Sequence, residues 1–191
     1  MMIVFGGAFN PPTIAHLNII KKLLSIYKGS QILLLPVGND YSKPELIDIK
    51  HRMQMLKILT MNSKNTQVSD LEANRKYQGT LASLKELGTI DDDIRFVIGS
   101  DNLARIKKWI KYEELLTTYP LIIMNRKGSL SEEEVNSLFA DVKHQFTFID
   151  FDEDISSTEA REHPEKRSEL LTDEVHQYIL KNHLYKESIY V

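Results

Sequence analysis

Two short segments near opposite ends of the 191-residue chain combine hydroxyl, basic and glycine residues at spacings that suit phosphate binding. The first, GGAFNPPTIAH, spans residues 6–16. Its glycines let backbone N–H groups approach a ligand closely. We expect a helix to begin near Ile14, so that its N-terminus and positive dipole end face the same space. Thr13 and His16 are three residues apart and share one face of the first helical turn. This segment therefore predicts a phosphate site.

The second segment, ISSTEAR, spans residues 155–161. The hydroxyls of Ser156 and Thr158, with the backbone amides of a helix start, can hold phosphate oxygens. Arg161 follows Thr158 by three residues and can contact a phosphate with two parallel N–H groups. Taken alone this pattern is typical of a helix cap. Together with the first segment it predicts a second phosphate-binding element, in a helix that Pro164 should end early.

Strand and helix patterns alternate along the chain. We expect short buried strands over residues 2–5, 31–35, 66–68, 95–98, 121–124 and 146–149. Helical patterns lie between them. One follows Asp48 and turns Met53, Leu56 and Leu59 inward, and another is capped by Thr80. This order predicts an α/β fold with a mainly parallel sheet of five to six strands and helices on both faces. No linker divides the chain, so we expect residues 1–191 to form a single domain whose ligands bind at the carboxyl ends of the strands.

Composition narrows the possible functions. The chain has 24 Lys and Arg against 27 Asp and Glu, a net charge of −3, and no cysteine. Thiol nucleophiles and Cys-based metal sites are therefore excluded, and a nucleic-acid partner held by a basic surface is not expected. The longest apolar run, Ile32–Val37, is far shorter than the roughly 20 residues of a membrane span. Because no signal peptide is evident either, we expect a cytoplasmic protein without a membrane partner.

The two segments, in this order, resemble the nucleotidyltransferase superfamily with the [HT]-x-G-H and ISST-x-x-R signatures. Within it the chain most resembles the bacterial nicotinate-nucleotide adenylyltransferase family, although Ala15 replaces the glycine of the first signature. Residues 96–101, the pair Lys108-Trp109 before residues 112–116, and the turn around Arg126 also resemble that family. The resemblance implies a Rossmann-like nucleotidyltransferase fold. It also implies transfer of AMP from ATP to the phosphate of nicotinate mononucleotide by direct in-line attack, giving deamido-NAD and pyrophosphate, with Mg²⁺ accompanying ATP.

The resemblance also implies roles for individual residues. Thr13, His16 and Arg161 would be catalytic, with His16 stabilising charge at the α-phosphate. The residues implied to bind ATP are Gly7, Ala8, Phe9, Thr13, His16, Gly99, Asp101, Asn125, Arg126, Ile155, Ser156, Thr158 and Arg161. Those implied to bind the acceptor are Lys43, Gly79, Thr80, Asp101 and Trp109, with Trp109 stacking on the pyridine ring. No residue is implied as a dedicated metal ligand, and a homo-oligomer is possible.

Two alternatives to this activity stay open, and one departure from the family favours the first of them. The family has P-S-Y-T where this chain has Tyr77-Gln78-Gly79-Thr80, so Gly79 stands at the tyrosine position. One alternative is an adenylyl- or cytidylyltransferase of the same superfamily that uses another phosphorylated acceptor, such as phosphopantetheine or a sugar phosphate. The other is a regulatory protein that binds nucleotides without catalysis. Trp109 argues against the first alternative, and the retention of His16, Asp101 and Arg161 argues against the second.

Overall fold

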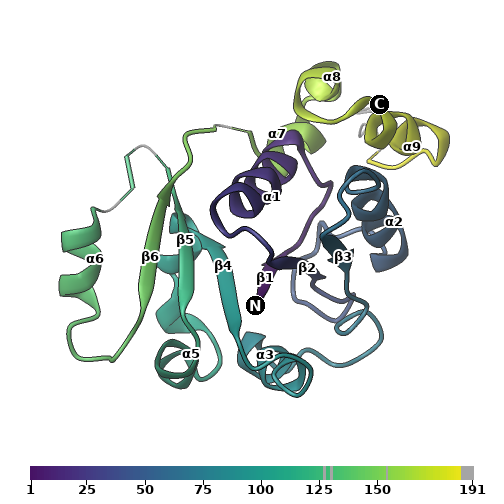
Figure 1. The fold of residues 1–191 in the computed structure, drawn as a ribbon. Helices are drawn as coiled ribbons and strands as arrows, with labels where there is room; N and C mark the ends of the chain where they lie inside the picture. The colour runs from purple at the N-terminus through teal and green to yellow at the C-terminus, as the bar shows by residue number, and fades with distance from the viewer. Residues whose placement is uncertain (127, 130, 154, 186–191) are drawn as a thin grey trace.

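The computed structural model describes residues 1–126, 128–129, 131–153 and 155–185. Within these residues, parallel strands form a six-stranded sheet in the order β3-β2-β1-β4-β5-β6 (Figure 1). The strands are β1 (Met2–Gly7), β2 (Gln31–Pro36), β3 (Thr66–Val68), β4 (Ile94–Gly99), β5 (Leu121–Asn125) and β6 (Phe146–Asp150). Each predicted strand lies within an observed one. Because the strand order reverses between β1 and β4, a ligand site is expected at their carboxyl ends.

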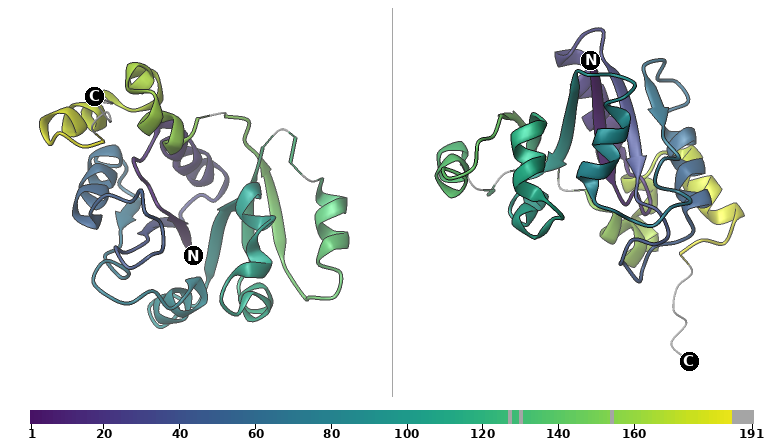
Figure 2. Two further views of the ribbon diagram at one scale, coloured as in Figure 1. Left: turned by 180° about the vertical axis from the view of Figure 1, so that it is seen from behind. Right: turned by 90° about the horizontal axis from the view of Figure 1, so that it is seen from below.

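Helices cover both faces of the sheet, as predicted (Figure 2). One face carries α3 (Thr80–Leu87), α4 (Ser100–Leu103), a 3₁₀ turn (Ile106–Lys108), α5 (Tyr112–Thr118) and α6 (Glu132–Leu138). The other face carries α1 (Ile14–Ile26) and α2 (Ile49–Leu59). Side chains alternate between the faces, so Val4 packs towards α3 while Ile3 and Phe5 pack towards α1. Full burial of Leu23 and Leu84 stabilises these two layers by about 1.5–3 kcal/mol each.

The C-terminal helices form a third layer against α2. They are α7 (Ser157–Glu162), a 3₁₀ turn (Pro164–Lys166), α8 (Arg167–Leu170) and α9 (Asp173–Lys181). Met55 and Leu59 of α2 are buried in one cluster with Val175 and Ile179 of α9. In Figure 1, α8 and α9 lie on the opposite side of the molecule from α6. The end of α7 at Glu162, just before Pro164, confirms the predicted early stop.

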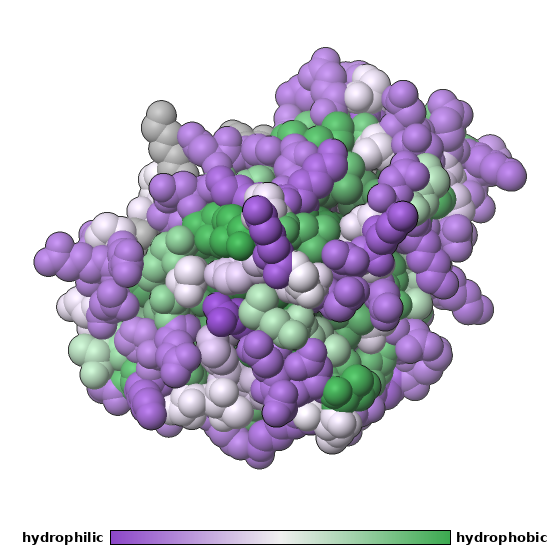
Figure 3. Space-filling model, in the orientation of Figure 1, coloured by the Kyte–Doolittle hydropathy of each residue, from purple (hydrophilic) through white to green (hydrophobic). Residues whose placement is uncertain are grey.

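The surface in the view of Figure 3 is mainly hydrophilic, with hydrophobic residues gathered in patches between charged ones. Among the described residues, no helix combines the length and the apolar character that crossing a bilayer demands.

Two local predictions are wrong. Met53 was expected to face inward, but it is half-buried, whereas Arg52 and Met55 are fully buried. Arg52 is inside because its guanidinium donates hydrogen bonds to two backbone carbonyls, which offset the cost of burial. Thr80 was expected to cap α3, but Gly79 is the cap and Thr80 is the first helical residue. Gly79 adopts a φ of +92°, a conformation that favours glycine over threonine.

Candidate active site

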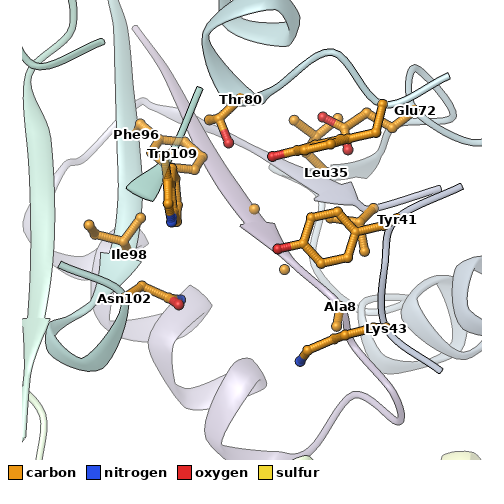
Figure 4. Close-up of a pocket in the computed structure, with 14 residues that line it drawn as sticks. Ala8, Leu35, Tyr41, Lys43, Glu72, Thr80, Phe96, Ile98, Asn102 and Trp109 are labelled. Atoms are coloured by element: carbon orange, nitrogen blue, oxygen red, sulfur yellow. The ribbon is translucent and has the colours of Figure 1, made fainter. Parts of the chain in front are cut away.

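A cleft with two connected lobes lies at the carboxyl ends of β1 and β4. The larger lobe lies between the β1–α1 loop, the end of β4 and the start of α7. The smaller lobe lies between β2, β4, Thr80 and Trp109 (Figure 4). The residues that line both lobes are Gly6, Gly7, Ala8, Lys43 and Asn102. A molecule that occupies both lobes must therefore pass over the β1–α1 loop.

Close packing fixes the shape of the β1–α1 loop. A Cβ atom on Gly6 would come within 2.9 Å of the Phe96 ring, so packing leaves no room for a side chain there. Phe9 is buried and has a φ of +48°, which is uncommon for a non-glycine residue. Arg52 donates a hydrogen bond of 2.9 Å to the carbonyl oxygen of Ala8. The loop thus presents its backbone to the cleft in one defined conformation.

His16 lines the larger lobe from the first turn of α1. Its Nδ1 atom accepts a hydrogen bond of 2.9 Å from the backbone N–H of Thr13, so the neutral ring carries its proton on Nε2. Burial, and secondarily the positive charge of Arg126, lower the pKa of His16 from its usual 6.5 to about 4. His16 is therefore a neutral donor at physiological pH.

The N-terminal turn of α7 forms the opposite side of the larger lobe. Ser156, Thr158 and Arg161 all line it, as the sequence predicted. The Ser156 hydroxyl accepts a hydrogen bond of 3.0 Å from the Glu159 amide, which caps the helix. Arg161 donates from Nη1 to the carbonyl of Asn10 at 2.6 Å and from Nη2 to Thr158 Oγ1 at 3.3 Å. These contacts aim the guanidinium at the space that His16 also faces.

The end of β4 supplies a third side of the larger lobe. Gly99 and Asp101 line it, together with Arg126 from the segment after β5. Asp101 is 77% exposed, and its Oδ2 lies 3.9 Å from Nη1 of Arg126. A Cβ atom on Gly99 would meet no atom within 4 Å, so this glycine leaves open space. Ile155 also lines the lobe, and with Gly7, Ala8 and Phe9 it completes the predicted ATP-binding residues that the structure brings together.

Three predicted site residues do not line the cleft. Thr13 is fully buried and directs its hydroxyl to His16 Nδ1 at 2.8 Å, so it supports His16 from behind. Asn125 lines a separate small cavity beside α6, because alternation along β5 turns its side chain away from Met124, which does line the larger lobe. Gly79 packs against Ile110, where a Cβ atom would lie only 2.9 Å from the Ile110 Cβ. The family tyrosine therefore cannot occupy this position without rearrangement.

The smaller lobe has a flat wall and a basic end. Trp109 and Thr80 line it, and the indole packs edge-on against Phe96 with ring centroids 6.2 Å apart. Figure 4 shows Trp109 and Ile98 on one side, Leu35 and Tyr41 facing them, and Lys43 at one end. Because Lys43 lines both lobes, it lies where the two lobes meet.

Sequence reasoning missed three side chains of the smaller lobe. Tyr41 and Tyr77 both line it and pack edge to face, with ring centroids 4.9 Å apart. The phenolic oxygen of Tyr77 interacts with Thr80. Tyr77, two residues before Gly79, therefore supplies an aromatic ring to the smaller lobe. Glu72 is only 5% exposed, and its Oε1 accepts a hydrogen bond of 2.6 Å from Ser83. Burial raises the pKa of the Glu72 carboxyl above its usual value. The only sequence feature that could have identified Tyr41 and Tyr77 as residues of this lobe is that both are aromatic.

The donors around the cleft do not form a metal cage. In the part of the chain that the structure describes, no three His, Asp or Glu side chains gather closely enough to hold an ion. The larger lobe instead offers cationic and neutral donors from His16, Arg126 and Arg161. Such donors suit phosphate oxygens.

Comparison with known proteins agrees with this geometry. The family model described as cytidylyltransferase-like matches residues 4–163. A protein of Acholeplasma laidlawii named "probable nicotinate-nucleotide adenylyltransferase" is 36% identical over 188 residues, covering 98% of both chains. The chain belongs to the nicotinate-nucleotide adenylyltransferases of the cytidylyltransferase-like family.

Other members of this family support the assignment. A Caldicellulosiruptor bescii protein with the same name is 31% identical, and the match covers 96% of this chain and 97% of that protein. Among solved structures, the Plasmodium falciparum nicotinic acid mononucleotide adenylyltransferase complexed with NaAD superposes with a TM-score of 0.82. It is 24% identical and the match covers 96% of both chains, so it supports the nucleotidyltransferase fold. The predicted fold and family are thus confirmed.

Proposed function

We propose that this protein transfers AMP from ATP to the phosphate of nicotinate mononucleotide, giving deamido-NAD and pyrophosphate in NAD biosynthesis. The observation that carries the proposal is the junction of a phosphate-binding lobe, containing His16 and Arg161, with a flat-walled lobe containing Trp109. The product would be a dinucleotide, in which a phosphate bridge joins two nucleoside halves, so one half can occupy each lobe. The names of the family members support the same reaction.

In the proposed reaction, ATP occupies the larger lobe. Arg161, Ser156 and Thr158 hold the β- and γ-phosphates, and His16 donates its Nε2 proton in a hydrogen bond to the α-phosphate. Asp101 accepts from a ribose hydroxyl, and the backbone of Gly7, Ala8 and Phe9 supports the phosphates. Mg²⁺ would accompany ATP as part of the substrate and would neutralise charge on its phosphates.

The acceptor occupies the smaller lobe. Its pyridine ring stacks on Trp109, its carboxylate faces the start of α3 at Thr80, and Lys43 attracts its phosphate to the junction. A phosphate oxygen of the acceptor attacks the α-phosphorus of ATP. That P–O bond forms as the bond to the bridging oxygen breaks, and pyrophosphate leaves with the electron pair. The enzyme contributes positioning and charge stabilisation, without a covalent intermediate.

A panel of acceptors tests this proposal. Purified protein, Mg²⁺ and ATP are incubated with nicotinate mononucleotide, nicotinamide mononucleotide, phosphopantetheine or a sugar phosphate, and pyrophosphate release is measured. The proposal requires the fastest release with nicotinate mononucleotide. A faster reaction with phosphopantetheine or a sugar phosphate would establish the alternative superfamily activity. We also propose that the reaction takes place in the cytoplasm.

A further inference from the structure

Asn10, in the β1–α1 loop, connects three distant parts of the chain although it is only 1% exposed. Its Oδ1 accepts hydrogen bonds from the Tyr185 hydroxyl at 2.8 Å and from the Ile47 amide at 3.3 Å. Its Nδ2 donates to the carbonyl of Glu45 at 2.9 Å. Its own carbonyl oxygen accepts the 2.6 Å hydrogen bond from Arg161. Any displacement of Asn10 therefore moves the acceptor that orients Arg161.

Tyr185 approaches Asn10 from the C-terminal segment, 175 residues along the chain. Its carbonyl accepts a hydrogen bond of 3.0 Å from Nη2 of Arg167, whose Nε donates to the Ala160 carbonyl in α7 at 2.8 Å. Tyr185 has a φ of +52°, a conformation that a non-glycine residue retains only where its surroundings hold it. The residue is therefore fixed at its backbone and at its hydroxyl.

The surroundings of Tyr185 keep its hydroxyl protonated. Burial raises its pKa, and this effect outweighs the opposing influence of three nearby arginines, Arg52, Arg161 and Arg167. At neutral pH the hydroxyl is thus a donor. Because Asn10 Oδ1 is an acceptor, the hydrogen bond from Tyr185 fixes the orientation of the Asn10 amide group. In this orientation the Asn10 side chain also hydrogen-bonds the backbone of Glu45 and Ile47.

We infer that Tyr185 is a positioning residue for ATP, since its hydroxyl holds Asn10, and Asn10 in turn orients Arg161 in the larger lobe. This inference rests on the proposed use of that lobe for ATP. Tyr185 does not line the lobe, so it acts through Asn10 and does not touch the nucleotide. Pre-orienting a planar guanidinium favours binding because less side-chain freedom is lost when the phosphate arrives.

The test compares Tyr185→Phe with a matched control, Tyr178→Phe. Tyr178 lies in α9 and its hydroxyl contacts His51 at 3.0 Å, so the control removes a similar hydrogen bond from the same C-terminal layer. Binding of a non-hydrolysable ATP analogue and of nicotinate mononucleotide is measured separately by calorimetry, and melting curves establish that each variant is folded. We expect Tyr185→Phe to weaken binding of the analogue about five- to tenfold, the scale of one lost hydrogen bond, with the acceptor unaffected. Tyr178→Phe should leave both affinities unchanged.

Two outcomes would overturn the inference alone. One is unchanged affinity of Tyr185→Phe for the ATP analogue, and the other is an equal loss for both ligands, which indicates general loosening. Wild-type protein that binds no ATP analogue would overturn the proposed function as well, so failure of the two claims is distinguishable.

Discussion

The backbone amide and the hydroxyl of Thr13 lie 2.9 Å and 2.8 Å from the same atom, Nδ1 of His16. Since the amide can only donate, Nδ1 is an acceptor and the remaining ring proton is on Nε2. The signature residue Thr13 therefore determines the tautomer of His16. In the proposed reaction this pairing makes His16 Nε2 the donor to the α-phosphate, although Thr13 itself is buried away from the lobe.

Replacement of His16 by alanine should lower turnover by about 10²–10³-fold, the scale of one lost oxyanion-type donor. Substrate affinities and folding should change less. His51→Ala is the matched control, because His51 contacts Tyr178 and does not line the cleft, and its turnover should stay near that of the wild type. Steady-state kinetics of the two variants provide the measurement. Near-native turnover of His16→Ala would remove His16 from the catalytic step.

The His16 ring should remain neutral as the pH is lowered through the usual histidine range. Its pKa is lowered to about 4, so the unfolded chain binds more protons than the folded one between pH 6.5 and 4. His16 thus contributes to loss of stability as the pH falls through that window. Nitrogen NMR shifts of the ligand-free protein, assigned by comparison with His16→Ala, should give a midpoint near 4 with the proton on Nε2. A midpoint near 6.5 would contradict the buried environment described above.

Replacement of Arg161 by lysine should weaken ATP binding about tenfold or more, because a hydrogen bond to a charged group contributes about 1.5–3 kcal/mol and each 1.4 kcal/mol is a factor of ten. The charge is kept, but the planar fork that reaches both Asn10 and a phosphate is lost. Affinity for the acceptor should change little. Separate titrations with ATP and with nicotinate mononucleotide decide the point, and equal weakening of both ligands would rule out a specific role of Arg161 in holding ATP.

The strands could be predicted from apolar runs in the sequence. The two segments that line the larger lobe could be predicted from the spacing of their hydroxyl and basic residues. Arg52 could not be placed, since pattern rules treat arginine as exposed and its burial depends on carbonyls of Ala8 and Ile47. The contact of Tyr185 with Asn10 joins residues far apart in the sequence and has no local signal. Asn125 was misplaced because a one-residue step along β5 reverses the face of the sheet.

Nicotinate mononucleotide should be preferred over the amide by at least about tenfold in kcat/KM, equivalent to about 1.4 kcal/mol. The start of α3 lies at Thr80, which lines the smaller lobe, and the positive end of the helix dipole there favours a carboxylate over a neutral amide. Side-by-side kinetics with the two mononucleotides provide the measurement. Equal rates, or a preference for the amide, would exclude a carboxylate pocket at Thr80.

Replacement of Glu72 by glutamine should raise the melting temperature at pH 7 more than at pH 4. Burial raises the pKa of this carboxyl, so the folded chain holds its proton to higher pH than the unfolded chain does. The unfolded chain then binds fewer protons, and stability falls as the pH rises above the ordinary glutamate value of about 4.3. Glutamine cannot ionise and removes this cost. Melting curves at both pH values test the prediction, and a variant that is destabilised more at pH 7 than at pH 4 would show that Glu72 stabilises the fold as a carboxylate.

In the proposed reaction, AMP from ATP is joined to the phosphate of nicotinate mononucleotide in the cleft between His16, Arg161 and Trp109. The most direct measurement supplies this acceptor with ATP that is radiolabelled at the α-phosphate in one reaction and at the γ-phosphate in another, and separates the products. The α label should appear in deamido-NAD and the γ label in pyrophosphate, in equal amounts, and both should fall sharply with the His16→Ala variant. An α label that appears only in free AMP, or a γ label released as inorganic phosphate, would contradict the proposed reaction.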